Sequence, residues 1–355
     1  MIKMPTRKIK KLTIKDVARI LEVSTATVSN AFNRPDQLSE ALRERILKEC
    51  KKLGYVGPSA AGRYLRTGRS GVVGVVLTDS LSYSMSDYVA SHFLAGLAEV
   101  FDEAHLNMLL LSARDMDQSG RQRQHESMVD GYIAYGMITA DGRTYEHLLR
   151  QQKRLIVVDN HIEGYPSINV DNRGAANEIA RYALRHKPQN LAILGLRVTS
   201  FPRISRLTQE DIDNAPDSIS IDRLNGYFDA IKEAGIQLPL DRIWNIPLNT
   251  HRWAYQAARE ALNTVPRPDL LLCMSDVIAI ATLQTALQMG LRVPEDIRIV
   301  GFDGIPETQN LHPSITTVHQ YSVEKGRRAA RMFLEPDTSE SLILPTELLI
   351  GESCP

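Results

Sequence analysis

The hydrophobic pattern of this chain changes near residue 71. Before it, apolar residues recur only at helical spacing; after it, short apolar runs alternate with amphipathic stretches. The runs predict buried strands at 72–77, 108–111, 132–138, 155–158, 191–194, 270–273 and 297–300. The amphipathic stretches predict helices, for example at 86–104, 173–186, 222–234, 251–263 and 276–289. Such alternation indicates parallel sheets with helices on both faces, and the chain beyond residue 71 is long enough for two lobes.

Residues 12–33, LTIKDVARILEVSTATVSNAFN, predict two short helices joined by a tight turn. Thr13 and Ser24 suit the N-cap positions, and Asp16 lies three residues after Thr13, as in a capping box. The second helix would present short hydrogen-bonding side chains, a surface that can enter the DNA major groove. An ordinary helical hairpin in a core is the alternative interpretation.

A third helix is predicted after Ser39, with an apolar stripe that includes Ile46 and Cys50, and Gly54 would end it. Residues 1–11 would be a mobile basic arm. Residues 59–65 suit either a plain linker or a short helix that is too small to persist alone.

Charge divides the chain in the same place as the hydrophobic pattern. Residues 1–70 hold 16 Lys and Arg against 6 Asp and Glu, whereas the whole chain holds 42 of each. A basic segment joined to an acidic remainder is typical of a nucleic-acid-binding module fused to another domain. The three cysteines lie far apart, and we find neither a signal peptide nor a membrane span, so we expect a cytoplasmic protein.

Catalytic signatures are absent from the sequence. We find no nucleotide-binding glycine loop, nucleophile elbow or zinc-protease motif, and the nine histidines are scattered. We therefore expect no enzyme activity, no cofactor and no metal. Residues 197–220 are polar and contain two prolines, which predicts a long, mobile surface loop.

The order of these segments resembles the LacI/GalR family of bacterial transcriptional regulators over nearly the full length. The matching segments are residues 13–33, the LGYVGPSAAGRYLRTGRS segment, VDN at 170–172, RLNGYFDAIKEAGI at 223–236, residues 274–306 and HPSITTVHQ at 312–320. The resemblance implies an all-α helix-turn-helix head and an α/β, two-lobed core like a type I periplasmic binding protein.

The resemblance also implies the domain boundaries. Residues 1–57 would form the DNA-binding domain, 58–70 a hinge helix or linker, and 71–355 the effector-binding and dimerisation core. Within the core, the N-lobe would comprise about 71–160 and 303–320, and the C-lobe about 161–301 and 321–355. The three crossings between the lobes would lie near 159–162, 301–303 and 320–322.

On the DNA side, the family's base-reading positions match Thr25, Ala26 and Asn30. An asparagine amide can pair with adenine N6 and N7, and small side chains can meet a thymine methyl group. The positions expected to hold the DNA backbone, or to cap the helix, are Ser24, Thr27, Ser29, Arg63 and Arg66. Leu65 matches the family's minor-groove leucine, which would kink the duplex.

In the core, the family's effector arginine matches Arg223 and its effector aspartate matches Asp276. A guanidinium and a carboxylate together suit a polyol, because one donates to hydroxyl oxygens and the other accepts from hydroxyl protons. Tyr83 or Tyr88 would supply an aromatic contact to the effector. Several positions depart from the family pattern: Glu22 stands where a glycine is usual in the turn, Gly57 is an extra residue, and Gly62 replaces an alanine.

These observations predict a homodimeric, sequence-specific regulator, most simply a repressor. It would bind palindromic double-stranded operator DNA under the control of a small effector, a sugar or sugar phosphate, and would have no membrane partner. Two alternatives stay open: a DNA-binding regulator that ignores effectors, and an enzyme that processes a sugar.

Overall fold

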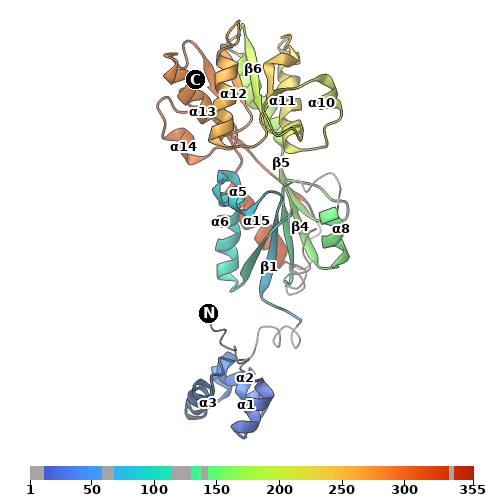
Figure 1. Cartoon of the computed structure of the whole chain (residues 1–355), viewed down its shortest axis with the longest axis vertical. Coiled ribbons are helices and arrows are strands. Elements are labelled where there is room, and N and C mark those ends of the chain that lie inside the picture. Colours follow the sequence, from blue (N-terminus) through green and yellow to red (C-terminus); the bar gives the residue numbers. More distant parts are fainter. Residues whose placement is uncertain (1–11, 58–67, 114–128, 137–142, 336–339) are drawn as a thin grey trace, which may run out of the picture. The chain divides into compact units, whose positions relative to one another are not determined.

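A computed structural model describes residues 12–57, 68–113, 129–136, 143–335 and 340–355 (Figure 1). Contacts divide the chain into two compact units, Met1–Gly71 and Val72–Pro355. We call the described part of the first unit the head and the second unit the core. The expected basic arm at 1–11 and the expected hinge helix at 59–65 lie outside the described residues.

The head is a bundle of short helices around a small core. Its elements are α1 (Ile14–Ile20), α2 (Thr25–Asn33), the 3-10 turn η1 (Pro35–Gln37) and α3 (Glu40–Lys52). Apolar residues at helical spacing meet inside it: Val17, Ala18, Val28, Ala31, Ile46, Cys50 and Tyr55. The three predicted helices are confirmed, and Cys50 belongs to the packed interior.

The N-lobe is built on a six-stranded sheet in which every pair of strands is parallel. The strand order is β12-β5-β4-β3-β1-β2. The strands are β1 (Val72–Leu77), β2 (Asn107–Ser112), β3 (Gly131–Tyr135), β4 (Arg154–Val158), β5 (Ser167–Val170) and β12 (Leu342–Leu344). The helices are α5 (Leu81–Ser86), α6 (Tyr88–Glu103), α8 (Arg143–Arg150) and α15 (Ser322–Leu334).

Helices α6 and α15 of the N-lobe pack backbone to backbone. A Cβ on Gly96 would lie 2.0 Å from the Val323 carbonyl oxygen, and one on Gly326 would lie 2.1 Å from that of Phe93. Only glycine permits so close an approach, so these two residues fix α15, from late in the chain, against α6, from early in it.

The C-lobe is built on a five-stranded sheet of order β10-β9-β6-β8-β7, in which only the β7–β8 pair is antiparallel. The strands are β6 (Leu191–Gly195), β7 (Ser205–Arg206), β8 (Ile243–Asn245), β9 (Leu270–Cys273) and β10 (Arg298–Val300). The helices and the 3-10 turn are α9 (Asn172–Leu184), α10 (Gln209–Asp213), α11 (Ile219–Glu233), η2 (Leu240–Arg242), α12 (His251–Leu262), α13 (Asp276–Gln288) and α14 (Pro306–Gln309). An antiparallel pair, β11 (Thr317–His319) with β13 (Glu347–Leu349), lies against α9.

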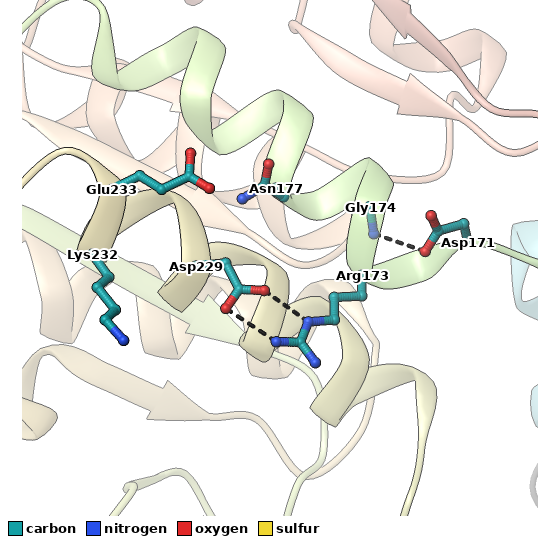
Figure 2. Close-up of a pocket in the computed structure, with 7 residues that line it drawn as sticks. All are labelled: Asp171, Arg173, Gly174, Asn177, Asp229, Lys232 and Glu233. Carbon is teal, nitrogen blue, oxygen red and sulfur yellow. Dashed lines mark hydrogen bonds and ion pairs between the residues drawn. The ribbon is translucent and has the colours of Figure 1, made fainter.

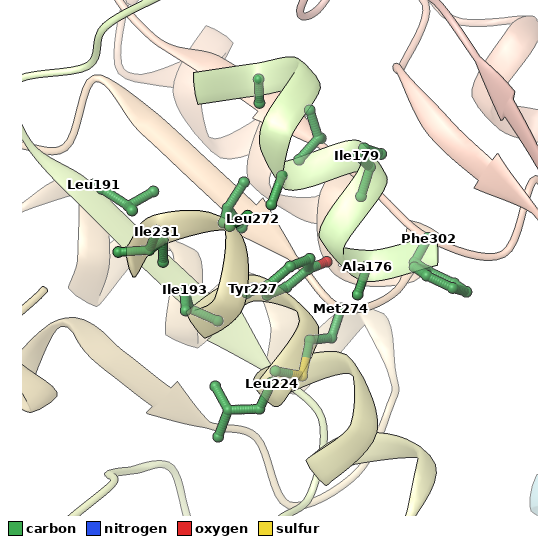
Figure 3. Packing of buried hydrophobic residues seen from close by; sticks show 14 of the residues in the cluster. Ala176, Ile179, Leu191, Ile193, Leu224, Tyr227, Ile231, Leu272, Met274 and Phe302 are labelled. Carbon is green, nitrogen blue, oxygen red and sulfur yellow. The ribbon is translucent and has the colours of Figure 1, made fainter. Parts of the chain in front are cut away.

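Helices α9 and α11 cover one face of the C-lobe sheet with apolar side chains. Figure 3 shows Ile179 of α9 and Tyr227 of α11 among the side chains of β6 and β9. The buried Tyr227 hydroxyl donates to the Cys273 carbonyl oxygen over 3.2 Å, so its one polar atom is satisfied. The helical face around Tyr227 therefore anchors the segment that carries Arg223.

The predicted lobe boundaries are wrong, although the number of crossings is right. Strand β5 pairs with β4 and β12, so residues 161–170 belong to the N-lobe. Helix α15 packs on α6, whereas β11 contacts α9. The described residues of 72–170 and 322–344 therefore belong to the N-lobe, and 303–320 belong to the C-lobe. The crossings lie between β5 and α9, between β11 and α15, as expected near residues 320–322, and between β12 and β13.

The prediction of a long, mobile surface loop at 197–220 is also wrong. The segment contains β7, which pairs with β8, and α10, which Thr208 and Asp211 start with a capping box. Leu207 is buried in the C-lobe core, and the Arg206 guanidinium lies 3.4 Å from the centre of the Trp244 ring. Two buried apolar residues, Val198 and Leu207, and one stacked cation thus hold an otherwise polar segment against the lobe.

Candidate functional sites

The head contains a helix-turn-helix whose two helices are both capped. Asp16 N donates to Thr13 Oγ1 (3.3 Å) and Thr13 N donates to Asp16 Oδ2 (3.0 Å), which completes the predicted capping box. Thr27 N donates to Ser24 Oγ over 2.9 Å. Between the helices, Glu22 adopts a left-handed φ of 54°. The turn thus keeps the usual geometry without the usual glycine.

The outward face of α2 carries the three predicted base-reading residues. Thr25 and Ala26 are exposed. Asn30 is half-buried, and its Nδ2 donates to Gln37 Oε1 over 3.1 Å. That bond leaves the Asn30 carbonyl oxygen and one amide hydrogen for a base edge. Gln37, which follows the helix in η1, was not predicted, since no helical spacing relates it to α2.

The side chains expected to hold the DNA backbone fall into three groups. Ser24 and Thr27 bond to each other and cap α2. Ser29 is only 5% exposed and its hydroxyl accepts from Asn33 Nδ2, so the expectation that it holds the DNA backbone is not supported. The expected hinge residues Arg63, Leu65 and Arg66 lie outside the described residues.

In the core, a cavity of about 260 Å³ lies between the two lobes. It draws on the ends of N-lobe strands, on α5 and the start of α6, on the start of α11 and on the β8–α12 loop. The lining residues with polar side chains are Thr78, Asp79, Tyr83, Ser84, Asp87, Tyr135, Asp159, Arg197, Ser218, Ser220, Arg223, Asn249, Asp303 and Gln320. Ligand sites of parallel α/β folds lie at this position, beyond the carboxyl ends of the strands.

Arg223, predicted as an effector ligand, lines this cavity and is 3% exposed. Its Nε donates to Asn172 Oδ1 (3.0 Å), and its Nη1 donates to the Met274 carbonyl oxygen (2.6 Å) and to Asp303 Oδ1 (3.2 Å). The guanidinium also lies 3.6 Å from the centre of the Phe302 ring. So many partners hold the side chain in one orientation.

Asp276, the other predicted effector ligand, does not line the cavity. It is fully buried, and its two oxygens accept from the Thr317 hydroxyl (2.5 Å) and from the Ile305 backbone N–H (2.9 Å). Burial raises the pKa of Asp276 above its ordinary value, and these hydrogen bonds oppose the rise. Asp276 therefore ties the start of α13 to the segments before α14 and at β11, and a direct ligand role for it is not supported.

Asp303 occupies the place expected for Asp276. It lines the cavity, it contacts Arg223, and its Oδ1 also accepts from Gln320 Nε2 over 2.8 Å. Burial raises the pKa of Asp303, and the nearby Arg223 guanidinium lowers it. Both aspartates follow a C-lobe strand, so only the fold distinguishes the one that faces the cavity.

A chain of hydrogen bonds runs from Arg223 across the crossing after β11 into the N-lobe. Gln320 joins Asp303 to Lys325, whose ammonium donates to Gln320 Oε1 (3.1 Å) and to Asp159 Oδ1 (2.7 Å). Lys325 is fully buried, and the other members of the chain line the cavity. One polar network therefore connects the two lobes beneath the cavity.

The two candidate tyrosines have different positions. Tyr83, on α5, lines the cavity, and its hydroxyl lies 3.4 Å from both Asp87 Oδ2 and the Asn249 carbonyl oxygen across the cleft. Tyr88 does not line the cavity; burial and the nearby Glu307 carboxylate of α14 raise the pKa of its hydroxyl. Tyr83 is thus the aromatic residue positioned to meet a ligand.

A second hollow lies on the surface between α9 and α11, with a volume of about 740 Å³ (Figure 2). Arg173 and Asp229 bind each other there through two hydrogen bonds of 2.7 and 3.1 Å, and Asp171 caps α9 through the Gly174 N–H. These groups satisfy one another at an exposed surface, so the cavity between the lobes is the better candidate for a ligand site.

Among the described residues, no group of three or more histidine, cysteine, aspartate or glutamate side chains is arranged to hold a metal ion. None of the described helices has the length and apolar character needed to cross a bilayer.

A capped helix-turn-helix and a two-lobed core with a polar cavity define a DNA-binding transcriptional regulator with a periplasmic-binding-protein-like domain. Comparison with known families agrees. Residues 13–57 match the family described as bacterial regulatory proteins, lacI family, and residues 188–354 match a periplasmic binding protein-like domain. The chain belongs to the LacI family, which confirms the resemblance seen in its sequence.

Relatives align along the whole chain. An HTH-type transcriptional regulator of Mycolicibacterium smegmatis is 34% identical over 97% of this chain and 96% of its own length. The HTH-type transcriptional repressor CytR of Escherichia coli is 28% identical, over 96% of each chain. A crystal structure of a LacI-family regulator from Corynebacterium glutamicum superposes with a TM-score of 0.70 at 27% identity, covering 98% of this chain and 100% of that one.

Proposed function

We propose that this regulator is a homodimeric repressor that binds a near-palindromic operator in the cytoplasm and changes its affinity when a small polar effector occupies the core cavity. The observation that carries the effector part is the cavity itself: Arg223 and Asp303 from the C-lobe and Asp159 from the N-lobe line the same space. The name of CytR supports the choice of a repressor.

The DNA part of the proposal depends on α2. A helix of nine residues with three outward candidates makes few base contacts alone, so one head would bind weakly. Two heads linked through the core would bind two half-sites together and gain avidity. The half-sites would then form an inverted repeat, because a two-fold dimer reads both strands alike.

The effector would act through the lobes. A ligand that contacts both Asp159 and Asp303 favours one lobe arrangement over another, and it can change operator affinity only by its difference in affinity for the two states. Coupling of about 1–3 kcal/mol would change operator affinity about 5- to 150-fold. We expect no turnover of the ligand.

Selection of DNA from a random pool by the whole chain tests the proposal. We expect an enriched inverted repeat that scrambled DNA of the same composition cannot replace at moderate salt. Asn30→Ala should relax selection at one base pair in each half-site and weaken operator binding about 10-fold or more, because the amide's base pairing is lost.

Asn33→Ala is the matched control, because the Asn33 amide donates to the Ser29 carbonyl oxygen of its own helix rather than outward. Equal losses on all DNA sequences for Asn30→Ala would show that Asn30 does not read bases. Failure of the pool to yield an inverted repeat would reject operator binding by a dimer.

A further inference from the structure

The cavity between the lobes carries more acidic than basic side chains. Four carboxylates line it (Asp79, Asp87, Asp159 and Asp303), against two guanidiniums (Arg197 and Arg223). A ligand that brings a negative charge would therefore meet repulsion from several directions.

The buried cations near the cavity already bind groups of the protein. Arg223 donates through Nε and Nη1 to Asn172, Met274 and Asp303, and one face of the guanidinium is covered by Phe302. Its Nη2 makes none of the described hydrogen bonds and can donate to a ligand hydroxyl. Lys325 is enclosed and bonds to Asp159 and Gln320. Arg197 is exposed at the cavity's edge, where water screens its charge. An anion at Arg223 Nη1 or at Lys325 would therefore compete with a buried carboxylate.

The carboxylate oxygens that line the cavity, in contrast, can accept further hydrogen bonds. Asp159 and Asp303 each receive the described side-chain bonds on Oδ1 alone, so Oδ2 of each can still accept. An oxygen in this position needs a donor, and a ligand hydroxyl provides one. Phosphate and carboxylate groups bring only further acceptors.

The size of the cavity limits the ligand further. A volume of about 260 Å³ corresponds to roughly nine liquid waters and lies below the roughly 300–1,000 Å³ that drug-sized ligands occupy. Tyr135 lines the cavity on the N-lobe side and stacks on the buried Phe93, with ring centroids 4.4 Å apart. This space suits one ring with hydroxyl groups on its edge.

We propose that the cavity binds an uncharged, single-ring polyol and rejects the phosphorylated or carboxylated form of the same compound. The inference rests on the proposed effector function and narrows it. Four carboxylates would distinguish the neutral ligand from its charged form. They are Asp79 and Asp87 at the α5 end of the cavity, and Asp159 and Asp303 at the end where the polar network joins the lobes.

Calorimetry on the whole chain with matched ligand pairs tests this inference. Each pair would hold a neutral hexose, pentose or cyclitol, its monophosphate, and for the hexose its uronate. We expect at least one neutral compound to bind and its charged partner to bind about 100-fold more weakly or worse.

Asp79→Asn removes one charge from the lining while the side-chain shape is kept. It should narrow the ratio of neutral to charged affinities about tenfold. Asp213→Asn is the matched control: Asp213 is exposed on α10, outside the cavity, and should leave the ratio unchanged. Thermal melts of both variants would show that each is folded.

The outcomes separate the two proposals. A phosphorylated compound that binds as tightly as its neutral parent would overturn the inference and leave the effector function standing. An unchanged ratio in Asp79→Asn would contradict the charge argument. If no compound of any pair binds to protein that still binds DNA, the effector function is rejected, and the inference is rejected with it.

Discussion

At the scale of single residues, Lys325 is the side chain whose replacement we expect to lower the stability of the core most. It is a fully buried ammonium with one carboxylate partner, Asp159, at 2.7 Å and one amide partner, Gln320, at 3.1 Å. A buried ion pair gains little over an apolar pair of the same shape, but removal of one partner leaves the other charge without compensation. The energy of this pair therefore depends on both members being present.

Lys325→Met should lower the free energy of unfolding of the core by about 3–5 kcal/mol, because Asp159 would remain buried and uncompensated. Denaturant titration of the whole chain measures this loss. Lys232→Met, at an exposed position on α11, should change stability by less than about 0.5 kcal/mol.

The double variant Lys325→Met with Asp159→Asn should recover most of the loss, since asparagine carries no charge and tolerates the left-handed φ of 55° at this position. If the double variant were no more stable than the single one, the loss would come from packing around Lys325 rather than from the orphaned charge.

The sequence identified one side of the candidate ligand site and missed the other. Arg223 could be found because its segment carries a recognisable motif. Asp303 could not be separated from Asp276 by spacing, because both follow a buried strand and only the turn after each strand decides which carboxylate faces the cavity. The hydrogen bonds that Asp276 accepts from Thr317 and Ile305 join residues far apart in sequence, so no local sequence pattern could predict them.

At the scale of elements, the continuity of the apolar pattern decided what could be predicted. The strands at 72–77 and 270–273 coincide with the predicted runs because neither run contains a polar side chain that interrupts it. Strands β5 (SINV) and β8 (IWN) are short and contain polar residues, so neither was predicted. Because β5 was missed, the first lobe boundary was misplaced. The capped α1 and α2 were predictable to within a residue or two, and their turn holds the one strained position of the motif, Glu22.

Glu22→Gly should stabilise the head by about 0.5–1 kcal/mol, because glycine adopts the left-handed φ of 54° without the steric cost that a Cβ brings. Unfolding of the 1–71 fragment, one of the two compact units, measures the gain.

Glu44→Gly in the interior of α3 is the control, and there we expect glycine to lower the stability of the head instead of raising it. At this exposed helical position glycine should cost about 1 kcal/mol. Equal losses in both variants would show that the turn carries no strain.

At the scale of the whole molecule, the proposed function requires that the core joins two heads. The head has its own buried core, and its seven enclosed side chains include Val17, Val28 and Ile46. It can therefore fold and present α2 by itself. What it lacks alone is the second half-site contact.

The isolated 1–71 fragment should bind the inverted repeat roughly 100-fold more weakly than the whole chain, because linkage makes the second contact intramolecular. Fluorescence anisotropy at one fixed salt concentration measures both affinities. On DNA with a single half-site, fragment and whole chain should bind about equally. Equal affinity for the full repeat would contradict the role of the core as a dimerising unit.

The N-lobe sheet has a consequence for how the protein is made. Its edge strand β12 comes from residues 342–344, long after β5 has ended at Val170. At about 5–20 residues per second, a ribosome needs roughly 10–30 s to supply that strand and α15. Throughout this interval the nascent chain exposes one edge of β5 and the glycine face of α6, while the intervening C-lobe strands can already pair. The C-lobe therefore can complete its sheet before the N-lobe does, although the N-lobe begins earlier in the chain.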